Sequence, residues 1–219
     1  KLLMKKWSKF IKSYGTEKRF TLGQSYSKIL IDDPKLLSFV LSRYKFVSKI
    51  LEGKKKVLEV GCGEAFGSPI IKKVVGELYC CDYWEKVLIE NKLRFKNFSD
   101  IKFVKHDFNI KPLKKNFDAA YLLDVFEHIS PSKSINFIKN ISKSLKKKSI
   151  LIIGVPNKTA EKYASAPSRL NHINLMTQKN MKKKIGKFFN QIMFFGMNDE
   201  TLHTGFDPMQ HYFFAVCIK

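Results

Sequence analysis

The sequence lacks the features of a membrane-spanning chain or of a cysteine-ligated metal site. Only four of its 219 residues are cysteines, and no C-x-x-C pair occurs, which argues against a zinc cluster. No run approaches the roughly 18 apolar residues that a membrane helix needs, and the basic N-terminal stretch is not typical of a signal peptide. Cys80 and Cys81 lie together in an apparent strand, where we expect both thiols to be buried and reduced. We therefore expect a cytoplasmic protein without a transmembrane segment.

Acidic residues are also scarce. The chain has 41 Lys and Arg against 19 Asp and Glu, a formal net charge of +22. Nearly all of this charge is lysine spread along the whole chain, whereas arginine is the residue that suits bidentate phosphate recognition. We therefore expect a solvated lysine-rich surface and no nucleic-acid partner. Acidic substrates, an anionic membrane surface and nucleic acid remain the alternatives.

Hydrophobic periodicity indicates alternating strands and helices. A helical pattern begins at Asp33-Pro34 and ends at Gly53. The expected strands follow it, at 57–60, 77–82, 101–107, 117–125, 149–155, 191–197 and 209–219. Most strands are followed by a helix, and the strand at 101–107 by a linker. The last two strands have no helix between them, so we expect the final strand to be antiparallel to its neighbour. The predicted fold class is α/β: a Rossmann-like, seven-stranded, mostly parallel sheet with helices on both faces.

The N-terminal part of the chain differs from the remainder. Residues 1–31 are basic and aromatic and show little clear periodicity. We predict that they form a separate segment, placed to cover a ligand of the domain that follows, and that residues 32–219 form that domain.

A glycine-rich loop follows the first predicted strand, in the stretch "VLEVGCGEAFGSPI" at 57–70. Such a loop holds a ligand against the backbone N–H groups of the next helix. The spacing alone fits a dinucleotide or S-adenosylmethionine, although Phe66 replaces the small residue of the usual dinucleotide fingerprint. Glu59 favours S-adenosylmethionine, because a carboxylate would repel a pyrophosphate but suits an ammonium and a sulfonium. We therefore expect Glu59 to help hold the positive end of the donor.

Further acidic residues end the next strands. Asp82 is placed to accept hydrogen bonds from ribose hydroxyls, as in both cofactor classes. Asp107 is placed to bind an adenine amino group, with the Phe108 ring packed on the base. The stretch "DVFEH", Asp124 to His128, ends the fourth strand and is expected to face the same crevice.

This ordered series resembles the class I S-adenosylmethionine-dependent methyltransferases, most strongly over residues 52–160. The resemblance implies S-adenosyl-L-methionine as donor and S-adenosyl-L-homocysteine as product. It also implies a donor site made of Glu59, Gly61, Cys62, Gly63, Asp82, Tyr83, Asp107, Phe108, Leu123 and Asp124. Ala65 stands where the family often has a third glycine, and we expect a slight adjustment of the loop there.

The "DVFE" stretch also narrows the acceptor. It lacks the N/D-P-P-Y/F motif of enzymes that methylate base amino groups, and it resembles the small-molecule branch of the family. We predict transfer to an oxygen or nitrogen of a small molecule. The resemblance extends to bacterial enzymes that modify surface-polysaccharide (capsule or lipopolysaccharide) or related metabolite precursors. Lysines near the expected pocket suit a phosphorylated or nucleotide-linked acceptor. An RNA or protein methyltransferase and a non-methyltransferase Rossmann-like cofactor-binding protein are the alternatives.

Histidine is the natural general base near neutral pH. We predict that His128 and His172 face the methyl group and that one of them is the base for a hydroxyl acceptor. The segments 14–31, 156–175 and 198–208 are expected to bind the acceptor, with the following side chains: Tyr14, Tyr26, Asn171 and His203. Methyl transfer requires no metal and no carboxylate trio stands out, so we predict no metal site. The oligomeric state is left open.

Overall fold

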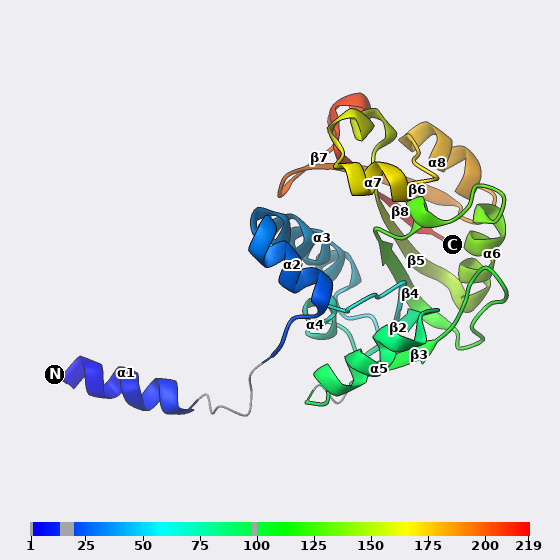
Figure 1. Ribbon diagram of the computed structural model, residues 1–219. Coiled ribbons are helices and arrows are strands. Elements are labelled where there is room, and N and C mark those ends of the chain that lie inside the picture. The colour runs from blue at the N-terminus through cyan, green and yellow to red at the C-terminus, as the bar shows by residue number, and fades with distance from the viewer. Residues whose placement is uncertain (1, 14–19, 98–99) are drawn as a thin grey trace.

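A twisted sheet with helices on both faces forms the body of the molecule (Figure 1). The computed structural model describes residues 2–13, 20–97 and 100–219, so the predicted acceptor residue Tyr14 lies outside the described residues. The strands are β1 (Lys56–Val60), β2 (Glu77–Asp82), β3 (Ile101–Lys105), β4 (Phe117–Leu123), β5 (Leu145–Pro156), β6 (Gln191–Asn198), β7 (Thr201–His203) and β8 (Tyr212–Ile218). The α-helices are α1 (Leu2–Ser13), α2 (Gln24–Asp32), α3 (Lys35–Leu51), α4 (Ser68–Lys72), α5 (Glu85–Arg94), α6 (Ser134–Ser144), α7 (Ala166–Asn171) and α8 (Gln178–Ile185). Short 3-10 turns are η2 (Phe126–His128), η3 (Lys158–Tyr163) and η4 (Asp207–Met209).

The strand order in the described part of the chain is β3-β2-β1-β4-β5-β8-β6-β7. Strands β1 to β5 pair in parallel, and β8 lies antiparallel between β5 and β6. The predicted fold class is therefore confirmed, with one correction: the sheet has eight strands rather than seven. The additional strand, β7, occupies the stretch predicted as a loop at 198–208. It pairs with β6 through only three residue pairs, too few to produce a hydrophobic pattern in the sequence.

The N-terminal segment contains two helices that are absent from the prediction. No side chain described in α1 or α2 is buried, so neither helix contributes to the core. The apolar residues of α1 nevertheless recur at helical spacing, a pattern that the prediction overlooked. The end of α2 lies within one residue of the boundary predicted between residues 31 and 32, and α3 begins at Lys35 after a short turn. None of the described helices is long and apolar enough to cross a membrane.

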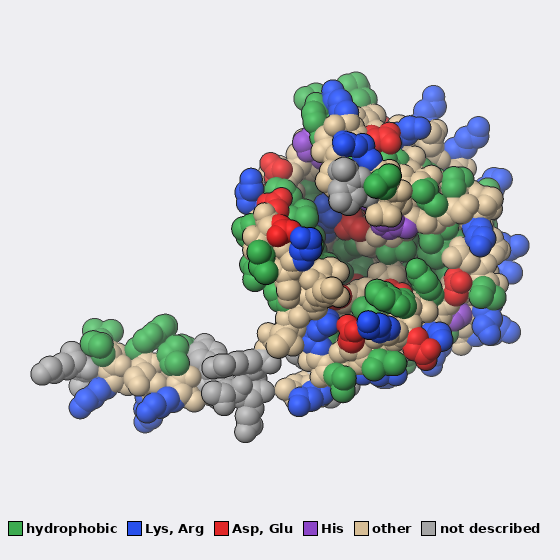
Figure 2. Space-filling model, viewed as in Figure 1, with side chains coloured by type: hydrophobic (Ala, Val, Ile, Leu, Met, Phe, Trp, Pro, Cys, Tyr) green, Lys and Arg blue, Asp and Glu red, His purple; other side chains and the backbone are tan. Residues whose placement is uncertain are grey.

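The lysine side chains are distributed over the surface rather than gathered on one side of the face shown in Figure 2. That distribution fits a solvated surface better than a single basic groove for a polyanion.

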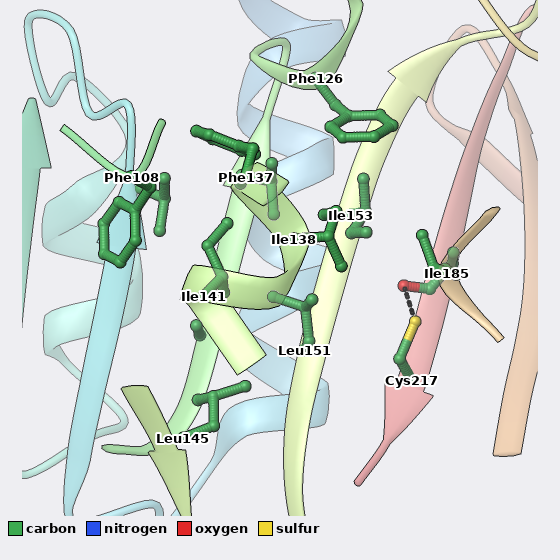
Figure 3. Packing of buried hydrophobic residues seen from close by; sticks show 14 of the residues in the cluster. Phe108, Phe126, Phe137, Ile138, Ile141, Leu145, Leu151, Ile153, Ile185 and Cys217 are labelled. Carbon is green, nitrogen blue, oxygen red and sulfur yellow. Dashed lines mark hydrogen bonds between the residues drawn. The ribbon is translucent and has the colours of Figure 1, made fainter. Parts of the chain in front are cut away.

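The core consists of two layers, one on each face of the sheet. Helices α3, α4 and α5 pack on one face, and α6 and α8 pack on the other, where Ile138, Ile141 and Leu151 meet (Figure 3). Successive residues of β1 alternate between the layers: Val57 joins the first, Leu58 the second. Burial of both faces is typical of parallel sheets and leaves the strand ends as the place for polar side chains.

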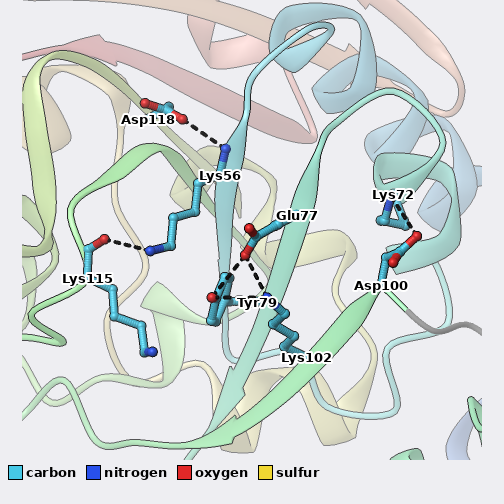
Figure 4. A network of polar contacts seen from close by, with 8 residues as sticks. All are labelled: Lys56, Lys72, Glu77, Tyr79, Asp100, Lys102, Lys115 and Asp118. Carbon is cyan, nitrogen blue, oxygen red and sulfur yellow. Dashed lines mark hydrogen bonds and ion pairs between the residues drawn. The ribbon is translucent and has the colours of Figure 1, made fainter.

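The two edges of the sheet differ in how their acids are partnered. At the amino ends of the strands, Glu77 binds Lys102 at 2.7 Å and Asp118 binds Lys146 at 2.6 Å. Figure 4 shows Glu77 with Lys102, and Asp118 where it also accepts from the backbone N–H of Lys56. At the carboxyl ends, no lysine pairs with Asp82 or Asp107 among the described residues. The unneutralised acids therefore gather at the edge where α/β sheets bind ligands.

Candidate functional site

Two adjoining cavities open at the carboxyl edge of the sheet, with volumes of about 490 and 690 Å³. They share four lining residues: Gly61, Gly63, Asp124 and His128. The face in Figure 2 is hollowed between the N-terminal helices and the α7 segment, with acidic and histidine side chains inside the hollow. The arrangement suits two ligands that meet at the shared residues.

The glycine loop forms the common wall of the two cavities. Gly61 has φ +70°, and a Cβ there would lie 2.6 Å from Cγ2 of Val125, so glycine is required for two independent reasons. The N–H groups of Gly61 and Cys62 both donate to the Cys81 carbonyl, at 2.8 and 2.9 Å, and this fixes the loop on β2. Ala65 also adopts a left-handed conformation, with φ +56°. The missing third glycine is thus accommodated by an alanine in a conformation that glycine prefers.

The smaller cavity contains the side chains predicted for the ribose and the base. Asp82 accepts from the N–H groups of Gly63 and Trp84, each at 3.0 Å, and its oxygens keep lone pairs for a ligand. Asp107 accepts from the Asn109 N–H at 2.8 Å. Phe108, Tyr83, Val60 and Lys133 line the same cavity. The structure therefore brings together the strand-end residues of the predicted donor site.

Glu59 does not lie where we expected it. Its side chain is only 2% exposed and lines neither cavity. Its oxygens accept hydrogen bonds from Tyr44 at 2.9 Å, Ser68 at 2.5 Å and the Cys80 thiol at 3.2 Å. We correct the expectation of direct donor contact, because these three donors hold the carboxylate beneath the loop, where it ties β1 to α3 and α4.

The end of β4 forms the floor of the site. Asp124 has φ +55°, which a short polar side chain tolerates, and its Oδ2 accepts from Arg43 of α3 at 2.7 Å. The guanidinium of Arg43 lies 4.0 Å from the centre of the Tyr212 ring. Leu123 and the buried Cys62 line the larger cavity beside this pair. Asp124 is thus held in place by a charge partner that the sequence did not reveal.

Helix α2 covers the larger cavity from the N-terminal side. Glu64, in the glycine loop, accepts from the N–H groups of Ser25 at 2.7 Å and Tyr26 at 3.1 Å, which are in the first turn of α2. A Cβ at Gly23 would lie 2.2 Å from the Glu64 carboxylate. The ring centres of Tyr26 and Phe66 are 4.4 Å apart, and Tyr26 lines the cavity. Its acceptor-binding role stays a prediction.

The other side of this cavity carries the predicted histidines. His128 and His172 both line it, and their ring centres are 5.1 Å apart. Asn171 lines it too, and its carbonyl oxygen is 3.0 Å from Nδ1 of His128. Burial, and next the neighbouring His128, lower the pKa of His172, which favours a neutral imidazole.

His203 is the predicted acceptor residue that the structure keeps apart. It lines neither cavity. One ring nitrogen lies 3.4 Å from Oδ1 of Asn198, and the other accepts from the Gly205 N–H at 3.1 Å. The side chain therefore stabilises the β6–β7 hairpin, and we correct the expectation that it contacts the acceptor.

Sequence reasoning missed two charged residues of the site. Arg43 is in the predicted helix at 33–53, and Glu64 is in the glycine loop, but their partners are 81 and up to 39 positions away. Glu127 was expected to help hold His128 or the methionine end of the donor; its side chain is 1% exposed and lines neither cavity. No local pattern distinguishes these side chains from surface charges.

Comparison with known proteins gives a consistent result. Residues 58–153 match a family model described as "Methyltransferase domain". No curated protein matches the sequence.

Several solved structures are similar in fold. The N-methyltransferase NodS from Bradyrhizobium japonicum in complex with S-adenosyl-L-homocysteine has a TM-score of 0.66 at 15% identity, with 87% of this chain and 90% of that chain covered. The methyltransferase domain of bacterial CtHen1-C has a TM-score of 0.66 at 19% identity, with 82% and 98% covered. A TehB-like S-adenosylmethionine-dependent methyltransferase from Corynebacterium glutamicum has a TM-score of 0.64 at 13% identity, with 90% and 100% covered. At these identities the likeness establishes the fold alone.

Proposed function

We propose, from the premise that residues 58–153 form a class I S-adenosylmethionine-dependent methyltransferase domain, that the smaller cavity holds the donor and the larger cavity a small-molecule acceptor. The observation that carries this proposal is the shared wall: Gly61, Gly63, Asp124 and His128 line both cavities. A methyl group bound there would be within reach of both ligands.

The charge of the smaller cavity supports the donor assignment. Three carboxylates, Asp82, Asp107 and Asp124, line it against one lysine, Lys133. S-adenosylmethionine carries an ammonium and a sulfonium, so an acidic lining attracts it even though the whole chain has a net charge of +22.

The reaction is an in-line displacement at the methyl carbon. A lone pair of the acceptor forms the new bond, and the carbon–sulfur bond breaks with its electron pair left on sulfur. Alignment of the two ligands alone supplies on the order of 7–11 kcal/mol. Tyr26 of α2 and His172 after α7 lie on the acceptor side, where they would exclude water and orient the acceptor.

The lining of the larger cavity bears on the acceptor class. Its charged residues are Glu64, Glu90 and Asp124 against Lys86. We propose a neutral or cationic acceptor with several hydroxyl or amino groups, such as a saccharide precursor, in preference to a phosphorylated one. The four cysteines are buried and free, and we place the reaction in the reducing cytoplasm.

The experiment that tests this proposal has two stages. Calorimetry should detect one S-adenosyl-L-homocysteine per chain, with no comparable binding of NADH. A screen with methyl-labelled donor against hydroxyl- and amine-bearing metabolites should then yield a labelled product. Absence of S-adenosyl-L-homocysteine binding would contradict the donor site, and transfer only to RNA or protein would contradict the small-molecule acceptor.

A macromolecular acceptor is the second candidate, and the net charge of +22 is the observation that favours it. A tight, salt-resistant RNA complex would promote it over the small-molecule proposal.

A further inference from the structure

Three side chains form a cluster at the larger cavity: His128 and His172, which line it, and Glu127, which is buried beside them. Each side chain offers one ligand atom, a carboxylate oxygen or an imidazole nitrogen, and these three atoms lie within 4.8 Å of one another. Glu127 is 1% exposed, and neither of its carboxylate oxygens accepts a hydrogen bond from another described residue. A buried carboxylate without a partner is costly, so this one indicates a cation that completes the cluster.

The two halves of the cluster come from distant segments that are fastened together. The N–H of Asn174 donates to the Glu127 carbonyl at 3.0 Å, and its side-chain amide donates to the Phe126 carbonyl at 3.2 Å. These hydrogen bonds hold the loop that carries His172 against η2, which carries Glu127 and His128. The cluster is therefore built into the fold rather than formed by chance contact of mobile side chains.

The orientation of His128 suits metal binding. Its Nδ1 lies 3.0 Å from the Asn171 carbonyl oxygen. Because a carbonyl only accepts, Nδ1 carries the proton, and Nε2 keeps its lone pair. Metal-binding histidines are commonly oriented in this way, by a backbone carbonyl that accepts from the other ring nitrogen.

We propose that Glu127, His128 and His172 bind one divalent transition-metal ion whose open coordination positions hold an acceptor hydroxyl. Two imidazoles and one carboxylate suit Zn²⁺, Co²⁺, Fe²⁺ or Mn²⁺ better than Mg²⁺ or Ca²⁺, which prefer oxygen ligands throughout.

The role of the ion in catalysis rests on the proposed function. A divalent cation lowers the pKa of a bound hydroxyl, which releases its proton to solvent water. The resulting oxygen forms the bond to the methyl carbon, and the carbon–sulfur bond breaks to leave S-adenosyl-L-homocysteine. The two histidines then hold the ion rather than accept the proton. This replaces both our expectation of a histidine base and our expectation of no metal site.

The test is a Co²⁺ titration of chelator-treated, tag-free full-length protein, followed by visible absorption and equilibrium dialysis, with Zn²⁺ as competitor and Mg²⁺ as comparison. We expect one Co²⁺ per chain, displaced by Zn²⁺ and not by Mg²⁺. His172→Ala and Glu127→Ala should each weaken Co²⁺ binding at least tenfold. His211→Ala, which removes an exposed histidine outside the cluster, should not.

The measurements distinguish failure of the proposed metal site from failure of the proposed methyltransferase function. Wild-type protein that binds no Co²⁺ or Zn²⁺ at 1:1, or His172→Ala protein that binds as tightly as wild type, would overturn the metal site. S-adenosyl-L-homocysteine calorimetry on the same samples reports on the proposed function, because His172 does not line the donor cavity. Donor binding without metal binding rejects the metal site alone, and metal binding without donor binding rejects the methyltransferase proposal.

An independent observation concerns helix α1. Its apolar side chains are strongly exposed: Leu3 85%, Met4 77%, Trp7 64%, Phe10 48% and Ile11 51%. With 3.6 residues per turn they span an arc of about 120°. Lysines occupy the opposite side, at positions 5, 6, 9 and 12, and the helix contains no acid. Figures 1 and 2 show α1 extending from the body, with apolar side chains along one side and lysines along the other.

We infer that α1 binds the surface of an anionic lipid bilayer. A Trp/Phe/Leu face opposite a purely lysine face is the composition of helices that lie in the membrane interface. The four lysines are complementary in charge to acidic lipid headgroups. An apolar patch on another protein would contact only the apolar face and leave these lysines without a role. The partner is therefore a lipid surface rather than a second copy of the chain.

Co-sedimentation of the full chain with vesicles tests this inference. We expect binding to vesicles with 30 mol% phosphatidylglycerol, at least tenfold weaker binding to pure phosphatidylcholine, and weakening as salt rises. The Trp7→Ser, Phe10→Ser double variant should bind the phosphatidylglycerol vesicles at least tenfold more weakly than wild type. The quadruple Lys→Gln variant of α1 should show a loss of affinity at least as large. A matched quadruple Lys→Gln variant at 139, 143, 147 and 179 should retain binding. Equal binding by the two quadruple variants, or self-association through α1 without vesicle binding, would overturn the inference.

Discussion

The guanidinium of Arg43 donates to Oδ2 of Asp124 over 2.7 Å and so joins α3 to the end of β4 across 81 positions of sequence. The pair lies at the floor shared by the two cavities, and Tyr212 packs on the guanidinium. It holds Asp124 in its left-handed conformation beside the glycine loop.

Replacing the arginine tests this relationship. Arg43→Met should destabilise the protein by about 2 kcal/mol, less than for a fully buried pair because the Asp124 side chain is 38% exposed. Urea unfolding measures the effect, with Lys45→Met, an exposed lysine of the same helix, as control. Equal stability of the two variants would contradict a structural role for the ion pair.

The donor site is tested at the two ends of β2. Asp82→Ala should weaken S-adenosyl-L-homocysteine binding by roughly 2–3 kcal/mol, because charged hydrogen bonds to the ligand are lost. Glu77→Gln, at the opposite end of the strand, should leave the affinity unchanged. Calorimetry on both folded variants measures the affinities. Unchanged affinity in Asp82→Ala would contradict the assignment of Asp82 to the donor site.

The carboxylate beneath the loop gives a stability prediction. Tyr44→Phe removes a donor from the buried carboxylate of Glu59 and should cost about 1–3 kcal/mol. Tyr79→Phe removes a hydroxyl that bonds the half-exposed Glu77, and should cost less than about 1 kcal/mol. Chemical denaturation without ligand compares them; the prediction fails if the second variant is as unstable as the first.

The same carboxylate predicts a pH dependence. Burial raises the pKa of Glu59, although hydrogen bonds from Ser68, Cys80 and Tyr44 oppose the shift. The folded protein thus holds this proton more tightly than the unfolded chain does. Its stabilising contribution is full below the unfolded pKa of about 4.3 and is lost as pH rises through the folded pKa. The unfolding free energy of wild type relative to Glu59→Gln should therefore fall as the pH rises above the unfolded pKa of about 4.3; a flat difference would contradict the raised pKa.

Because the lysines are spread along the whole chain, we predict only weak nucleic-acid binding despite the net charge of +22. If the lysines form a solvated surface, single-stranded RNA should bind with Kd above about 1 μM at about 0.2 M salt, and binding should weaken steeply as salt rises. Fluorescence anisotropy at two salt concentrations measures this. Sub-micromolar binding at the higher concentration, with preference for one sequence, would favour the macromolecular acceptor instead.

Much of the fold could be predicted because its signals are local. Strands such as β2 are apolar runs bounded by turns, and the glycines at 61 and 63 mark positive φ angles that the structure contains. The short β7 escaped prediction because it pairs through only three residue pairs, and α2 because it carries no buried stripe and depends on a carboxylate from another segment, Glu64. The apolar periodicity of α1 is present in the sequence, and the prediction overlooked it.

The sequence by itself determined the α/β class, the methyltransferase resemblance and the strand-end acids Asp82 and Asp107. The physical reason is that parallel strands bring their carboxyl ends to one edge, so position along each strand already places these side chains together. Only the tertiary structure decided that Glu59 is turned into the interior, that His203 belongs to a hairpin, and that Glu127, His128 and His172 meet. Those outcomes depend on contacts between segments tens of residues apart, where packing and hydrogen bonding leave no periodic trace in the sequence.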